Sequence, residues 1–310
     1  MRNHLTSRAG DWALLVALFL GTLIAPAAAA ADPARGLPAG EARVAHYLPH
    51  MTWEEVEQYL RTSDMVILPV GSIEQHGKHL PLGSDIIAAV ETSVRIGQKT
   101  GVLVAPVLLA GASDHHMGFP GTISLAPATL EAVLYDTARS LIAHGFKRIM
   151  FLNGHGGNET TVTNVVYRIN RETAATAIDL WRIDLPPTDP RLKDVKLDYH
   201  AGVEETSIMM CLAGGLVQMS KAENPKLTFP ASVQAISEKI AGRNREALDN
   251  ATLFQPERSG KGTSTREISS NGVVTTGDLK TASADLGRAV VDANVEAVVR
   301  FIEAWKLVGH

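Results

Sequence analysis

Residues 70–85, VGSIEQHGKHLPLGSD, lie between two stretches that predict different secondary structure. The apolar run at 65–68, MVIL, is short and rich in strand-forming residues, which is typical of a buried β-strand. Residues 86–90, IIAAV, begin a helical pattern. The sequence therefore predicts a strand, then a long polar loop, then a helix. In open α/β sheets, ligands bind at loops that leave the carboxyl ends of strands.

Two carboxylates and an imidazole lie on this predicted loop, at Glu74, His76 and Asp85. Such residues within one glycine-containing loop are candidate metal ligands. The alternative is a solvated polar loop, which would be the better interpretation for any one of them alone. A second histidine loop further along the chain favours the metal site.

The remaining pattern alternates strands with helices, which predicts a mostly parallel sheet covered by helices on both faces. We read the mature chain, residues 32–310, as one α/β domain without repeats or long linkers. Residues 255–281, rich in Gly, Ser and Thr, predict a loop or β-hairpin over the sheet edge. Strands are predicted at 65–70, 102–105, 148–152 and 177–183, and helices at 52–61, 86–99, 127–145, 161–172, 203–212, 233–248 and 286–308.

Length and composition bound the class of protein. The chain has 310 residues and 45% hydrophobic content, enough to bury a full core. Its formal charge of −4 and lack of a basic run argue against a nucleic-acid partner. A single cysteine, Cys211, excludes a disulfide framework and a thiolate metal cluster.

The N-terminus has the pattern of a secretory signal. Arg2 and Arg8 precede an apolar run at 12–24, and small residues follow up to Ala31. An uncleaved membrane anchor is the alternative, but the apolar run is short for a span. We therefore expect residues 1–31 to be a signal peptide. Its removal would leave a protein without a membrane anchor in the periplasm or outside the cell.

A second polar loop follows the predicted strand at 148–152 and reads NGHGGN, residues 153–158. Its glycines allow a sharp turn that brings His155 to the sheet edge. Glycines at a helix start also bind phosphates, but this loop lacks the lysine of a P-loop. Glu74, His76, Asp85 and His155 would form a set suited to Zn²⁺, Mn²⁺ or Fe²⁺. With one bridging carboxylate, such a set holds two ions ~3.5–4 Å apart.

Residues 200–207, HAGVEETS, are a third candidate, in which His200 and Glu205 would serve in catalysis as a proton shuttle, and Glu205 also as a further ligand. Acids in a first helical turn are also common without function, because they favour the helix dipole.

The loop that carries Ser113 and His116 is expected to face the substrate. A serine nucleophile is the alternative, but no G-x-S-x-G turn surrounds Ser113. His79 is interpreted as a solvated histidine or one that supports the metal ligands from outside.

With these residues assembled, the chain resembles the creatininase family (creatinine amidohydrolase and relatives). The matching pieces run in the family's order over roughly residues 50–305. They are GSIEQHG at 71–77, LPLGSD at 80–85, FPGT at 119–122, NGHGGN at 153–158, HAG at 200–202 and ETS at 205–207.

The resemblance implies an α/β/α sandwich with two divalent ions at the C-terminal side of the sheet. Glu74 and His155 would bind one ion, His76 the other, and Asp85 would bridge them.

Creatinine-cleaving members carry a tyrosine and a ligand glutamate where Gly156 and Gly157 stand here. Glu205 is our candidate to replace that ligand, and Gly156 is a candidate for substrate contact. Tyr199 also stands where those members have an acidic residue. Relatives with the NGHGGN form act on formamides or peptide-derived amides, which widens the expected substrate class beyond creatinine.

We therefore expect a metal-dependent amidohydrolase that cleaves a C–N amide bond in a small molecule. The resemblance also implies a homo-oligomer, such as a hexamer. Two alternatives are a metallophosphoesterase and a periplasmic metal- or ligand-binding protein with a degenerate site.

Overall fold

The computed structural model describes residues 43–108, 110–240 and 251–308. The predicted signal peptide at 1–31 lies outside the described residues, and the single-domain boundary stays a prediction. In the part that is described, no helix combines the length and apolar character needed to span a bilayer.

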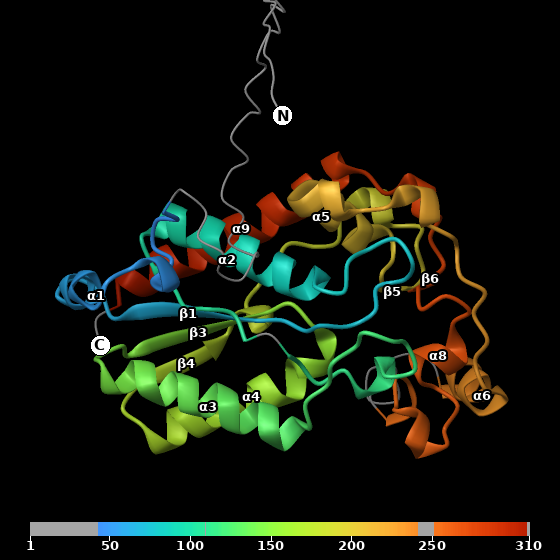
Figure 1. The fold of residues 1–310 in the computed structure, drawn as a ribbon, viewed down its shortest axis with the longest axis horizontal. Coiled ribbons are helices and arrows are strands. Elements are labelled where there is room, and N and C mark those ends of the chain that lie inside the picture. Colours follow the sequence, from blue (N-terminus) through green and yellow to red (C-terminus); the bar gives the residue numbers. More distant parts are fainter. Residues whose placement is uncertain (1–42, 109, 241–250, 309–310) are drawn as a thin grey trace, which may run out of the picture.

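A parallel four-stranded sheet forms the centre of the fold (Figure 1). Its strand order is β2–β1–β3–β4, and every neighbouring pair is parallel. The strands are β1 (Met65–Val70), β2 (Leu103–Val104), β3 (Arg148–Asn153) and β4 (Thr176–Asp179). Because β1 and β3 are central and start in register at Met65 and Arg148, their carboxyl ends lie side by side. The loops that follow them therefore begin next to each other.

Helices cover both faces of this sheet (Figure 1). One face packs against α3 (Pro127–Ala143) and α4 (Glu159–Glu172), and α1 (Trp53–Leu60) contributes to the same cluster. The other face packs against α2 (Ser84–Thr100) and α9 (Ala284–Lys306). The helix α5 (Val203–Ala213) contacts both α9 and α2. The three-layer α/β/α arrangement predicted from the sequence is confirmed.

Alternation along the strands divides the core between the two faces. Val66, Leu68 and Phe151 belong to the cluster under α3 and α4, whereas Met65 and Ile67 belong to the cluster under α2 and α9. All six residues of β1 are buried, which is why its sequence is a continuous apolar run rather than an alternating one.

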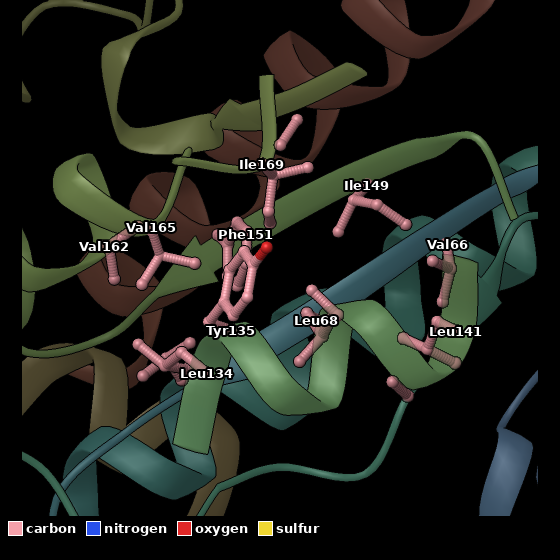
Figure 2. Packing of buried hydrophobic residues seen from close by; sticks show 14 of the residues in the cluster. Val66, Leu68, Leu134, Tyr135, Leu141, Ile149, Phe151, Val162, Val165 and Ile169 are labelled. Atoms are coloured by element: carbon pink, nitrogen blue, oxygen red, sulfur yellow. The ribbon is translucent and has the colours of Figure 1, made fainter. Parts of the chain in front are cut away.

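Phe151 lies at the centre of the first cluster (Figure 2) and is fully buried. We expect Phe151→Ala to lower the free energy of unfolding by about 3–5 kcal/mol, because it removes a large side chain and leaves a cavity. Urea unfolding measures this change. Tyr167→Ala is the control, since Tyr167 is 68% exposed and its loss should change the free energy by less than about 0.5 kcal/mol. Equal losses for the two variants would contradict this packing.

The segment at 255–281 differs from its prediction. It contains a short helix α8 (Thr265–Ile268) and a strand β6 (Val274–Thr275). The partner of β6 is β5 (Asp198–His200), antiparallel, rather than a second strand of the same segment. This pairing places the start of α5 beside the end of the chain's glycine-rich region.

The helix predicted at 233–248 begins at Ala231, and its described part, α6, is Ala231–Ile240. Residues 241–250 lie outside the described part, so the predicted end of this helix is not tested. The strand predicted at 177–183 is shorter: β4 ends at Asp179, and a 3₁₀ turn, Leu180–Arg182, follows.

Candidate metal centre

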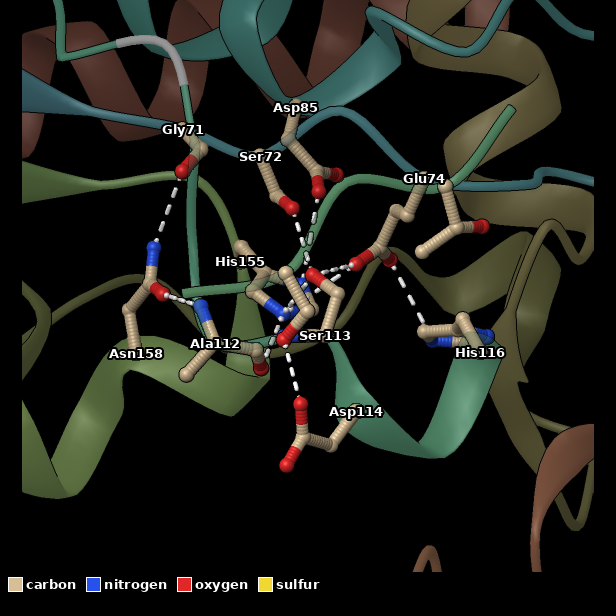
Figure 3. A network of polar contacts seen from close by, with 12 residues as sticks. Gly71, Ser72, Glu74, Asp85, Ala112, Ser113, Asp114, His116, His155 and Asn158 are labelled. Atoms are coloured by element: carbon tan, nitrogen blue, oxygen red, sulfur yellow. Dashed lines mark hydrogen bonds and ion pairs between the residues drawn. The ribbon is translucent and has the colours of Figure 1, made fainter. Parts of the chain in front are cut away.

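Acidic and imidazole side chains from several segments meet at the carboxyl end of the sheet, and Figure 3 shows Glu74, Asp85, His116 and His155 among them. Glu74 and His76 follow β1, His116 follows β2, and His155 follows β3, while His200 ends β5. Among the described residues, three sets of side chains each bring their candidate ligand atoms within 4.8 Å of one another. The sets are Glu74 with His116 and His200, His76 with His200 and Glu205, and Glu74 with His76 and Asp85.

Asp85 lies in the first turn of α2, which begins at Ser84. The prediction that it belongs to the loop was wrong, because the start of the helix was inferred from the apolar residues that begin at Ile86. A helical position holds the carboxylate more rigidly than a loop would. Asp85 Oδ1 is 3.1 Å from His76 Nε2, and its Oδ2 is 3.3 Å from His155 Nδ1.

The two histidines beside Asp85 have their second nitrogens engaged by acceptors. His76 Nδ1 is 3.2 Å from the backbone oxygen of Glu74, and His155 Nε2 is 3.1 Å from that of Ala112. A carbonyl only accepts, so these nitrogens keep their protons. His76 Nε2 and His155 Nδ1 are then the atoms that carry lone pairs when the rings are neutral. Each faces a different oxygen of Asp85.

Two buried carboxylate oxygens in this cluster, Glu74 Oε1 and Asp85 Oδ2, have no hydrogen-bond partner. Buried carboxylate oxygens without such partners are costly unless they are paired with a charge or coordinate a metal. Together with the two lone pairs that face Asp85, they make a donor set that fits two divalent ions with Asp85 between them. His155 contacts Asp85 and Glu74 but belongs to none of the 4.8 Å groups.

Glu205 lies in the first turn of α5, and its Oε2 is 3.8 Å from His76 Nε2. The same oxygen accepts a hydrogen bond from the backbone nitrogen of Ala201 at 2.6 Å. Its side chain is 39% exposed, whereas that of His76 is 1% exposed. The cluster is therefore open to solvent on the side of Glu205.

The structure explains why residue 157 is a glycine. A Cβ atom there would lie 2.2 Å from the backbone oxygen of Ala112 and 2.4 Å from His155 Nε2, so this backbone leaves no room for a glutamate. Gly156 is exposed, and a Cβ atom there would have no neighbour within 4 Å. The position expected to contact substrate thus faces open space.

The structure places the two other candidates for substrate contact, Ser113 and His116, deep in the cluster. Ser113 is fully buried, and its hydroxyl donates to Glu74 Oε2 at 2.6 Å (Figure 3). His116 is 2% exposed, with its Nε2 3.3 Å from Glu74 Oε1. Both side chains support Glu74 here, and a direct contact with substrate stays a prediction.

His79 is buried rather than solvated, and its Nε2 is 2.9 Å from the hydroxyl of Thr206. Thr206 follows the candidate ligand Glu205 in the chain, and a supporting role of His79 stays a prediction.

Sequence reasoning missed the residues that fix the loops to one another. The side chain of Asn158 donates to the backbone oxygen of Gly71 at 3.0 Å and accepts from the backbone nitrogen of Ala112 at 2.9 Å (Figure 3). It therefore joins the loops that follow β1, β2 and β3. The NGHGGN motif contained the signal, but only its histidine was interpreted.

The charges of the cluster shift the pKa values of its members. Burial alone would lower the pKa of His76, but Asp85, Glu205 and Glu74 raise it to about 10. Likewise, burial opposes protonation of His155, while Glu74 and Asp85 raise its pKa to about 9.

The pKa values of Glu205 and His200 shift in the directions that favour their neutral forms. Desolvation is the main cause of the raised pKa of Glu205, about 7. Burial, with His76 nearby, lowers the pKa of His200 to about 3, so this imidazole is neutral near pH 7.

These values predict that metal binding releases protons. His76 and His155 are protonated below about pH 9 without metal, and a metal ligand must be neutral. We expect about two protons to be released per subunit at pH 7.5, and metal affinity to rise with pH until about pH 9–10. Calorimetric titration in buffers of different ionisation enthalpy measures the number. Metal binding without proton release at pH 7.5 would contradict this assignment.

The doubly covered sheet and the paired carboxylate–imidazole site together define an α/β metal-dependent hydrolase. A family model described as "Creatininase: Creatinine amidohydrolase" matches residues 49–302. The chain therefore belongs to the creatininase family and is a hydrolase that acts on amide C–N bonds. The predicted resemblance is confirmed.

Two relatives and two solved structures illustrate the similarity. Creatinine amidohydrolase of Pseudomonas putida is 30% identical over 59% of this chain and 78% of its own length. The mycofactocin precursor peptide peptidase of Mycobacterium tuberculosis is 33% identical over 79% of this chain and 86% of its own. Creatininase structures of a Zn–Zn type mutant and a Mn form each have a TM-score of 0.61 and 25% identity, covering 84% of this chain and 98% of theirs.

Proposed function

We propose that this protein hydrolyses a C–N amide bond in a cyclic amide, a formamide or a peptide-derived amide, with two divalent ions held by Asp85 and its neighbours. The observation that carries the proposal is the placement of Asp85, whose two oxygens face the lone-pair nitrogens of His76 and His155 at 3.1 and 3.3 Å. Glu74 and Glu205 would complete the two sets of ligands.

Divalent ions at such a site polarise an amide carbonyl and lower the pKa of water toward ~7. The chain's own residues supply the proton transfer. His200 Nε2 donates to the backbone oxygen of Gln75 at 2.6 Å, which fixes the ring and leaves Nδ1 facing the cluster. A neutral His200 can accept the proton of the attacking water at Nδ1 and pass it to the leaving nitrogen. An amine leaves only when it is protonated, so this step is required.

Glu205 supports a substrate position on the open side of the cluster. It is the most exposed of the proposed ligands, and Gly156 also faces open space. With a pKa of about 7, Glu205 is also suited to exchange protons near neutral pH.

The substrate class is tested by turnover with the metal-loaded protein. A panel of creatinine, other cyclic amides, N-formyl compounds and short peptides, followed by release of the amine, would show which amide is cleaved. We expect hydrolysis of at least one of these amides, with creatinine a poor substrate because Tyr199 and the glycines at 156 and 157 replace groups of creatinine-cleaving members. Turnover of aryl phosphates in place of all amides would contradict the proposal.

Location and assembly complete the proposal. The apolar run at 12–24 with its flanking arginines supports export to the periplasm or beyond, followed by cleavage before residue 32. The resemblance to the creatininase family supports association into a homo-oligomer such as a hexamer. N-terminal sequencing of the mature protein and light scattering of its native mass test these two points.

A further inference from the structure

The side-chain amide of Gln75, between Glu74 and His76, has a fixed orientation. Its Oε1 accepts from the backbone nitrogen of Gly77 at 3.0 Å, and its Nε2 donates to the backbone oxygen of Gly272 at 3.0 Å. Reversing the amide would place its NH₂ group against the N–H of Gly77 and its oxygen against the carbonyl oxygen of Gly272. Both glycines have positive φ, 65° and 87°, and a Cβ atom on Gly272 would lie 1.9 Å from Gln75 Oε1.

This fixed amide determines which nitrogen of His116 carries the proton. Gln75 Nε2 lies 2.9 Å from His116 Nδ1, and an amide N–H can only donate, so Nδ1 accepts. The hydroxyl of Thr265, also 2.9 Å from Nδ1, can donate to the same atom. The proton of the neutral ring therefore lies on Nε2, which is 3.3 Å from Glu74 Oε1. A nitrogen that carries a proton has no lone pair for a metal ion.

The proton of His200 is also held on Nε2, by the backbone of the same residue. Its Nε2 lies 2.6 Å from the carbonyl oxygen of Gln75, which only accepts, so the proton is on Nε2. Its Nδ1 is unprotonated and lies 3.7 Å from Glu74 Oε1. The rings of His116 and His200 pack with their centroids 4.2 Å apart. One carboxylate oxygen thus faces an N–H from one ring and a lone pair from the other.

We propose that Gln75 is a positioning residue that holds His116 and His200 in the same Nε2–H tautomer, with opposite ring nitrogens turned toward Glu74. His116 thereby turns an N–H toward Glu74, with Nε2 3.3 Å from Oε1 but no hydrogen bond between them, and is not a metal ligand, although its distances alone admit it to a ligand group. His200 keeps Nδ1 available for the proton. The role of His200 rests on the proposed function, whereas the exclusion of His116 from the ligands does not need turnover.

The first test counts metal ions in His116→Leu, titrated with Mn²⁺ alone. We expect the same number of ions per subunit at saturation as in the parent protein, with affinity weakened about 10–100-fold, as for residues that support ligands. His116→Gln should recover most of this affinity, because its amide can again place an N–H near Glu74. His155→Leu is the control that loses an ion. A saturated His116→Leu protein with one ion fewer than the parent would overturn the proposal.

The second test measures the coupling of His116 to Gln75 through Mn²⁺ affinity in a double-mutant cycle. Gln75→Met removes the amide that fixes the tautomer and leaves the backbone carbonyl that holds His200. We expect His116→Leu to weaken affinity about 10–100-fold in the parent and by much less in Gln75→Met. Equal losses in the two backgrounds would show that Gln75 does not act through His116. Neither test uses a substrate, so a failed amide screen leaves both results interpretable.

Discussion

Asp85→Asn is expected to abolish both metal binding and turnover. The amide keeps the shape of the carboxylate but replaces one oxygen with a donor, which would face His76 Nε2 or His155 Nδ1 in place of a ligand. Because Asp85 would hold both proposed ions, both would lose a ligand or gain a repulsive contact. We expect amide hydrolysis to fall more than about 100-fold, beyond the range of residues that only support ligands. Elemental analysis and kcat/KM measure the two effects.

Asp179→Asn is the matched control for this variant. Asp179 is also a buried aspartate with an oxygen that lacks a hydrogen bond, but it ends β4 outside the cluster. Its substitution should leave metal content unchanged. An Asp85→Asn protein that kept both ions and parental kcat/KM would remove the basis of the bridging role.

Glu205→Gln is expected to have the second largest effect. The ion beside His76 would have His76 and Asp85 as ligands. The backbone at Gly157 has no room for a side chain that could add another. Glu205 is then the carboxylate available there, 3.8 Å from His76 Nε2. We expect the variant to lose or bind weakly one of the two ions, with kcat/KM reduced more than about 100-fold. Its Oε1 can still accept from Ala201, so the fold should be retained.

Glu204→Gln removes the same charge from the same helical turn. Glu204 belongs to none of the ligand groups found among the described residues, so metal content and turnover should stay near the parental values. If Glu204→Gln and Glu205→Gln lost activity equally, the effect would come from charge at the start of α5 and not from ligation. Full activity with two bound ions in Glu205→Gln would show that another group completes the site.

The sequence predicted which loops meet, because parallel strands end at one edge of a sheet. Glu74, His76 and His155 follow β1 and β3, which are adjacent and in register, so their proximity follows from the order of elements. The positions of these residues relative to the predicted strands were therefore enough to predict that they lie close together. The layers were predictable for the same reason, since strands buried on both faces require helices above and below.

What the sequence did not predict depends on short elements and uncharged side chains. The strands β5 and β6 have three and two residues, too few for any periodicity, so the position of His200 was not predictable. Helix α2 begins after Gly83, which has no side-chain cap to mark its start.

The roles of the Gln75 and Asn158 amides were not predictable from the sequence, because an uncharged amide carries no sign of metal or nucleophilic chemistry. Each makes contacts that join segments far apart in the chain: Gln75 reaches Gly272, and Asn158 reaches Gly71. Their donor and acceptor patterns determine tautomers and loop positions, and these are visible only in three dimensions.

The most direct test of the account is the metal content of the protein, measured by elemental analysis after gentle purification without chelators. The geometry around Asp85 predicts about two equivalents of Zn, Mn or Fe per subunit, as in two-metal hydrolytic sites. One equivalent or none, persisting after reconstitution with excess Zn²⁺ or Mn²⁺, would contradict the dinuclear site and with it the proposed mechanism.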